Sequence, residues 1–103
     1  MPTATMEAPV SGQATLPGGW TNFNFNLSQK AKEVFKKAVH DLVGVGYTPL
    51  AFATQVVAGT NWCFLSEARV PGSDYENAVL LYIYQPLKGD PHIIEINTIK
   101  PGL

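Results

Sequence analysis

The residues that could support catalysis are one cysteine and two histidines. Cys63 is the only cysteine, and a thiol beside an imidazole is the arrangement that activates a cysteine nucleophile. His40 falls late in a helical pattern, whereas His92 begins the last strand pattern of the chain. Cys63 alternates with Trp62 and Phe64, which predicts a half-exposed thiol on the sheet face away from the core. We therefore expect an inert cysteine and no enzyme activity.

No pattern for a metal ion, a phosphate group or another cofactor stands out. The two histidines are remote in sequence and have no acidic cluster beside them. Gly44-Val45-Gly46 lacks the Lys-Ser or Lys-Thr pair of a phosphate-binding loop. The carboxylates at Glu7, Glu33 and Asp41 do not have the spacing of a general acid–base pair. A single cysteine also excludes an internal disulfide and a four-cysteine metal site, so we expect no cofactor.

The composition is that of one small globular domain. The chain has 103 residues, 46% of them hydrophobic, which is too apolar for disorder and too short for two cores. Its net charge of -1 lacks the basic excess that nucleic-acid binding requires. The longest apolar run, residues 78–84, is far shorter than the ~20 residues that cross a bilayer, so we expect no membrane partner. The lone cysteine and a first dozen residues without Lys or Arg predict a cytoplasmic protein, although a removed signal peptide would leave the same pattern.

One helix and four strands are predicted from the hydrophobic periodicity. Residues 1–19 are rich in Pro, Thr, Ala and Gly and have no period, which predicts a flexible N-terminal arm before a single domain at residues 20–103. Apolar residues recur at helical spacing over residues 27–43, with Asn26 as the expected N-cap and Gly44 as the stop. Patterns of period two predict strands over residues 50–57, 62–70, 78–84 and 92–99.

The order of these elements predicts the architecture. A hairpin needs an apolar partner to be stable in water, and a single helix is available to cover the strands. Turns at residues 58–61, 71–74 and 86–91 join consecutive strands, which favours antiparallel pairing. We therefore expect an α+β fold in which a four-stranded antiparallel sheet wraps on a single helix. Trp20, at the end of the arm, is expected to pack in the core on the helix, with a position beside the hairpins as the alternative.

The segment from Gln55 to Trp62, Gln-Val-Val-Ala-Gly-Thr-Asn-Trp, resembles the signature of the cystatins, which plug the active-site cleft of papain-like cysteine peptidases. The family pattern is Gln-x-Val-x-Gly, commonly followed by a hydroxyl or small residue, Asn and an aromatic residue. A Gly18-Gly19 pair before one long helix and a second hairpin at residues 85–91 also lie at the family's distances. Without disulfides, the chain is similar to the stefins over residues 16–99, and the resemblance implies a cystatin-like fold.

The chain departs from the family pattern at three places. Trp62 stands where Tyr is commoner, and the arm before Gly18 is longer than in many stefins. The second hairpin has Pro86-Leu87 in place of a Pro-Trp pair. Since Leu buries less area than Trp, this contact should contribute roughly 1 kcal/mol less to binding.

The resemblance implies a reversible, competitive inhibitor that performs no chemistry. The arm would enter the non-primed subsites, with Gly18 or Gly19 as the hinge where the chain turns away from the scissile position. The first hairpin would fill the cleft as an uncharged loop stiffened by two β-branched residues. The residues expected to contact the peptidase are Gly18, Gly19, Gln55, Val56, Val57, Ala58, Gly59, Pro86 and Leu87.

Two alternatives stay open at this stage. Ala-Gly is also a common hairpin turn, so the alternative function is a cystatin-fold binding module without peptidase inhibition. The expected state is a monomer, but exchange of the helix and the first strand between two chains would fit the same pattern. We expect Gly59→Glu to keep the fold and to weaken inhibition by about tenfold or more, because a charge would be buried in a dry cleft.

Overall fold

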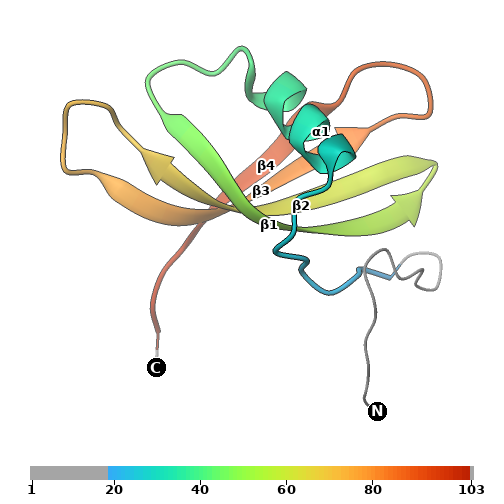
Figure 1. Ribbon diagram of the computed structural model, residues 1–103, viewed down its shortest axis with the longest axis horizontal. Coiled ribbons are helices and arrows are strands. Elements are labelled where there is room, and N and C mark those ends of the chain that lie inside the picture. The colour runs from blue at the N-terminus through green and yellow to red at the C-terminus, as the bar shows by residue number, and fades with distance from the viewer. Residues whose placement is uncertain (1–18, 103) are drawn as a thin grey trace.

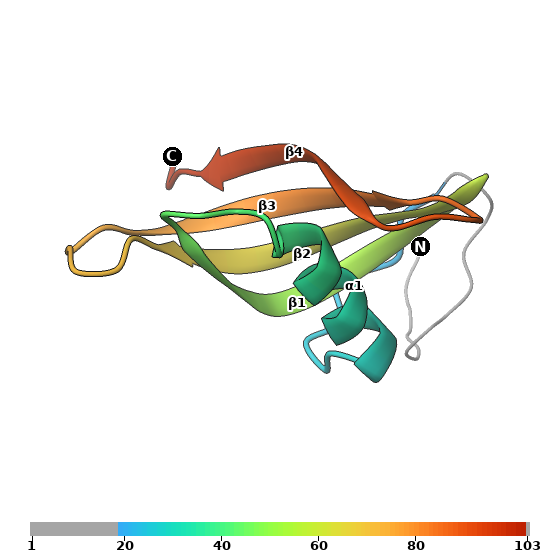
Figure 2. The same ribbon diagram turned by 90° about the horizontal axis from the view of Figure 1, so that it is seen from above.

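One helix packs on one face of a four-stranded sheet in the computed structural model, which describes residues 19–102 (Figures 1 and 2). The elements in chain order are α1 (Gln29–Val39), β1 (Gly46–Val57), β2 (Gly59–Arg69), β3 (Glu76–Gln85) and β4 (His92–Ile99). Neighbouring strands pair antiparallel in the order β1-β2-β3-β4. The expected α+β arrangement of one helix on four antiparallel strands is confirmed.

The helix is shorter than the periodicity predicts. Ser28 is the N-cap, and its hydroxyl accepts a hydrogen bond from the Ala31 backbone N–H at 3.0 Å. The expected cap, Asn26, is wrong because its backbone N–H donates to the side chain of Asn24 at 2.8 Å, which closes a local turn before the helix. The helix then ends at Val39, several residues before the expected stop.

The core lies between α1 and the two central strands. The buried cluster consists of Ala31, Val34 and Phe35 from the helix, Trp62 and Phe64 from β2, and Leu81 and Ile83 from β3. Phe35 meets Phe64 edge to face, with ring centroids 4.9 Å apart. This packing supplies the apolar partner that both hairpins need to be stable.

Three strands, β1, β2 and β3, extend further than predicted at one or both ends, whereas β4 spans the predicted residues 92–99. Pairing of Val57 with Gly59 leaves Ala58 alone at the apex of the first hairpin, so the expected turn at residues 58–61 is wrong. β1 starts at Gly46 and contains a bulge between Pro49 and Ala51. Proline has no backbone N–H for the ladder, which explains a register shift beside Pro49.

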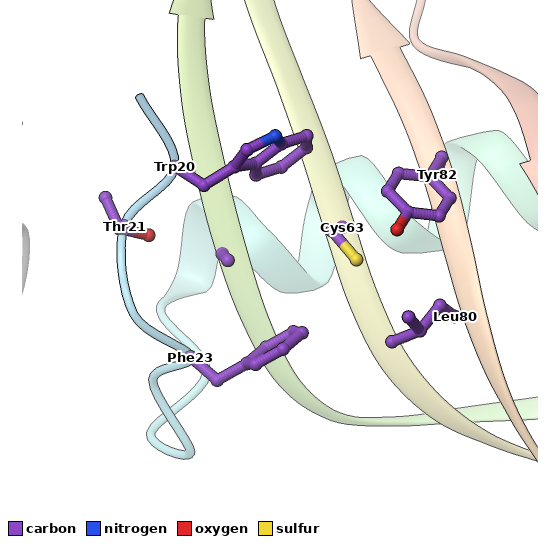
Figure 3. A pocket seen from close by; sticks show the side chains of 7 residues that line it. Trp20, Thr21, Phe23, Cys63, Leu80 and Tyr82 are labelled. Atoms are coloured by element: carbon purple, nitrogen blue, oxygen red, sulfur yellow. The ribbon is translucent and has the colours of Figure 1, made fainter. Parts of the chain in front are cut away.

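The segment before the helix runs along the outer edge of β1. Thr21 N–H donates to the Thr54 carbonyl at 2.9 Å, and Asn24 exchanges backbone hydrogen bonds with Phe52 at 2.8 and 3.0 Å. This pairing directs Trp20 onto the sheet face opposite the helix, where its ring lies edge-on to Tyr82 with centroids 6.0 Å apart (Figure 3). The expectation that Trp20 packs in the core is therefore wrong.

The described residues also bear on membrane insertion. Within residues 19–102, no helix has both the length and the apolar character of a membrane-spanning segment. The one helix, α1, has 11 residues, and its exposed side carries four lysines.

Candidate functional site

Both hairpins turn at the same end of the sheet, to the right in Figure 1. The first hairpin contributes residues 55–61 and the second contributes residues 85–91. A bridge between Trp20 and Gln55 brings the chain at Gly19 to the same end. We call these residues the hairpin end. Gly18, the other glycine of the expected hinge, lies outside the described residues.

Gly59 sits where the two hairpins touch. Its φ of +104° belongs to the left-handed region that favours glycine. A Cβ atom at this position would overlap the Gln85 carbonyl oxygen and lie 3.1 Å from Pro86 Cα. Any side chain here would push the second hairpin away, so Gly59→Glu would strain the hairpin end as well as add a charge, and the expectation that this variant keeps the fold stays a prediction.

Side chains of β3 tie the second hairpin to the first. The Tyr84 hydroxyl donates to the Ala58 carbonyl at the hairpin apex. Trp62 Nε1 donates to Gln85 Oε1 at 3.2 Å, so one glutamine joins a core aromatic residue to the hairpin end. Sequence analysis missed Tyr84 and Gln85, because their only signal is their register opposite Asn61 and Thr60.

The first hairpin is apolar and exposed at its tip, whereas the second hairpin carries the exposed charged residues Lys88 and Asp90 beside Leu87. Val56, Val57 and Ala58 are exposed, and Leu87 is 81% exposed at the second hairpin. No charged residue lies between Gln55 and Asn61, whose side chains hydrogen-bond across the turn at 2.8 Å. Burial of this tip in a partner would therefore require no desolvation of a charge on the first hairpin.

Cys63 lies on the face away from the helix, as expected, but it is buried with only 4% of its surface exposed. Its sulfur points into a cavity of about 190 Å³, with Trp20 and Phe23 on one side and Leu80 and Tyr82 on the other (Figure 3). The expectation of a half-exposed thiol is wrong because the segment before the helix covers this part of the sheet.

The surroundings of Cys63 make its thiol a weak nucleophile. Burial raises the pKa of the thiol, and the neighbouring Tyr82 hydroxyl opposes that rise only in part. His40 caps α1 on the other side of the sheet, and His92 packs edge-on against Tyr84 with ring centroids 5.7 Å apart. A thiol held in its neutral form beside a tyrosine suits packing rather than attack on a substrate.

The acidic and thiol groups of the described residues do not gather around a common point. Over residues 19–102, no group of three or more His, Cys, Asp or Glu side chains could hold a metal ion. The ion pairs found over the same range join Arg69 to Glu67 and to Glu76, at the end of the sheet opposite the hairpin end.

Comparison with known proteins assigns no family to the chain. No protein-family model matches it, and no curated protein matches it significantly. The motif at Gln55–Gly59 and the geometry of the hairpin end are therefore the observations from which a function can be inferred.

Proposed function

We propose that the chain is a cystatin-like protein of the stefin type, which inhibits papain-like cysteine peptidases by closing their active-site cleft. The single observation that carries the proposal is the position of the Gln-Val-Val-Ala-Gly segment at the apex of the first hairpin, beside the second hairpin. A cleft inhibitor needs a protruding edge at this place, and the motif alone does not guarantee one.

The physical character of the first hairpin supports a role as a plug. Val56 and Val57 restrict the conformations of the loop before binding, so little conformational entropy is lost in the complex. Ala58 is small enough for the main chain to approach the floor of a cleft. The contact between Tyr84 and Ala58 further holds the apex against the second hairpin.

The neighbouring segments enlarge the contact. Leu87 adds an exposed apolar side chain on one flank of the first hairpin, and Gly19 starts the described chain on the other flank. The first hairpin, Leu87 and the chain at Gly19 together are consistent with an interface of standard size, about 800 Å² on each partner. The inhibition would be reversible and noncovalent, since the hairpin end offers no reactive group.

The test is the titration of papain with the full chain, compared with two variants. We expect stoichiometric loss of peptidase activity with the unmodified chain. Ala58→Glu should raise the inhibition constant by about tenfold or more, because the carboxylate would be buried without a partner. Val43→Glu is the matched control, since Val43 is 89% exposed in the connection between α1 and β1, at the other end of the sheet.

Each outcome separates the two candidate functions. Both variants should keep the melting temperature of the unmodified chain, because both side chains are exposed. No inhibition at micromolar excess would favour a cystatin-fold binding module without peptidase inhibition. Equal inhibition constants for Ala58→Glu and Val43→Glu would show that the first hairpin is not part of the interface with the peptidase.

A further inference from the structure

The two outer strands of the sheet are protected very differently. The free edge of β1 is covered by the segment before the helix, through the three backbone hydrogen bonds of Thr21 and Asn24. β4 pairs with β3 on one side, and over residues 19–102 no other segment pairs with its outer side. Figure 2 shows β4 at the border of the sheet, away from the segment that covers β1. Its outward backbone groups are thus available to another strand.

β4 lacks most of the features that keep an edge strand from pairing. His92–Ile99 contains no proline, no glycine and no lysine, and Glu95 is its only acidic residue. Ile94, Ile96 and Ile99 are all exposed, to 55%, 38% and 39%. The bulge opposite Tyr82 and Ile83 lies near the start of the strand, so residues 95–99 form a regular edge. Such an edge is a docking site for an extended strand.

We propose that β4 pairs antiparallel with β4 of a second copy of this chain, which joins two sheets into one of eight strands. The sequence of β4 is complementary to itself in a register centred on Ile96. Ile96 then faces Ile96 of the second copy, and Glu95 faces the second copy's Asn97, whose amide donates to the carboxylate. This register sets no like charges directly opposite each other.

This complementarity is the reason to choose a second copy over a foreign peptide. The twofold axis repeats the pair of Glu95 and Asn97 on both sides of the central isoleucines. The Glu95 carboxylate of each copy would thus accept a hydrogen bond from the Asn97 amide of the other copy. A contact through one strand is smaller than a standard interface, and we therefore expect a reversible, concentration-dependent dimer.

The dimer would leave the hairpin ends free. Antiparallel pairing about an axis perpendicular to the sheet keeps both helices on the same face. It also directs the two hairpin ends away from each other, since each lies at one end of its own strands. The inference therefore does not depend on the proposed inhibition, and the two can be tested separately.

The test is sedimentation velocity of the full chain at protein concentrations up to about 1 mM, where weak association is still detected. We expect the average mass to rise from the 11.2 kDa of one chain toward twice that value. Ile96→Lys should remain monomeric at every concentration, because two lysines would face each other across the axis. Val43→Lys, in an exposed position outside β4, should associate like the unmodified chain.

A further variant tests the register without touching a partly buried side chain. Asn97→Lys places a lysine opposite the second copy's Glu95, so association should tighten several-fold at low salt and weaken as salt is added. In a register centred on residue 97 the same variant would oppose two lysines and loosen the dimer. A monomer over the whole concentration range would overturn the proposal. So would a dimer that neither Ile96→Lys nor Asn97→Lys changes, because it would have to form through exchange of elements or through another surface.

Discussion

The hairpin end and the opposite end of the sheet both contain a glycine in the left-handed region, but only one of the two glycines is packed against another segment of the chain. Gly59 has a φ of +104° and touches the backbone of the second hairpin. Gly72, in the turn between β2 and β3, has a φ of +78°, and a Cβ there would meet nothing within 4 Å. Gly59 is therefore constrained both by its backbone conformation and by the atoms packed against it, whereas Gly72 is constrained by its backbone conformation alone.

The first hairpin also differs from the opposite end of the sheet in charge. It presents exposed valine and alanine with no charge from Gln55 to Asn61, and the charged residues of the hairpin end, Lys88 and Asp90, lie on the second hairpin. At the opposite end, Arg69 lies between Glu67 and Glu76, and all three side chains are largely in contact with water. The apolar first hairpin is thus held by close packing against the second hairpin, whereas the solvated turn at the opposite end is held by local hydrogen bonds and exposed ion pairs.

The largest expected effect comes from replacing the two glycines in turn. Gly59→Ala should lower the free energy of unfolding by about 2–4 kcal/mol, because left-handed strain adds to the overlap with the Gln85 carbonyl. Gly72→Ala should lower it by only about 1 kcal/mol, from strain alone. Urea unfolding at equilibrium measures both. Equal losses would show that the two hairpins separate easily and that Gly59 is not packed as described.

A smaller effect is expected from Cys63, which lies between the two ends in β2. Burial raises the pKa of its thiol above the ordinary value of 9.0, so the folded chain keeps a proton that the unfolded chain loses. The contribution of Cys63 to the free energy of unfolding should therefore stay constant well below pH 9 and fall as the pH rises through and beyond that value. Tyr82, whose pKa is also raised by burial, should add a second decline above pH 10.0.

The pH dependence due to Cys63 also tests whether substitutions at the two ends of the sheet act independently. Urea unfolding at a series of pH values should show the first decline in the unmodified chain and its absence in Cys63→Ala. The decline should also be the same in Gly59→Ala and in Gly72→Ala, if each glycine acts only at its own end. A decline that disappears in Gly59→Ala would show that the strain reaches the middle of the sheet.

The smallest effect is expected at the exposed ion pairs. Arg69→Ala should lower the free energy of unfolding by about 0.5 kcal/mol or less, because Arg69 and its carboxylate partners are roughly half exposed and screened by water. In high salt, the free energy of unfolding of the variant should become equal to that of the unmodified chain, because salt screens the ion pairs. A loss above about 1 kcal/mol would mean that the opposite end is held more firmly than its exposure indicates.

Several features of the fold could be predicted because they depend on residues close in sequence. The helical repeat placed Val34 and Phe35 on the buried side of α1, and the alternation in β2 placed Trp62 and Phe64 toward the helix. The end of the sheet at which the two hairpins meet follows from their order along the chain, since antiparallel neighbours turn at alternating ends.

The errors have a different origin. Cys63 was expected to be half-exposed because the alternation of β2 does not reveal that Trp20 and Phe23 return over that face. The expected effect of Gly59→Glu left out a steric cost because the motif does not reveal that Gln85 lies against the glycine. In both cases a distant segment decided the environment of a correctly located residue.

The sequence by itself determined the class of fold, the order of its elements and the position of the motif on a hairpin, because periodicity and turn chemistry act over a few residues. The tertiary structure alone decided which edge is covered, how deeply Cys63 is buried and why a side chain at Gly59 would strain the contact between the two hairpins. These properties depend on atoms brought together from separate strands, and pairing register, which controls such contacts, is set by the packing of the whole sheet.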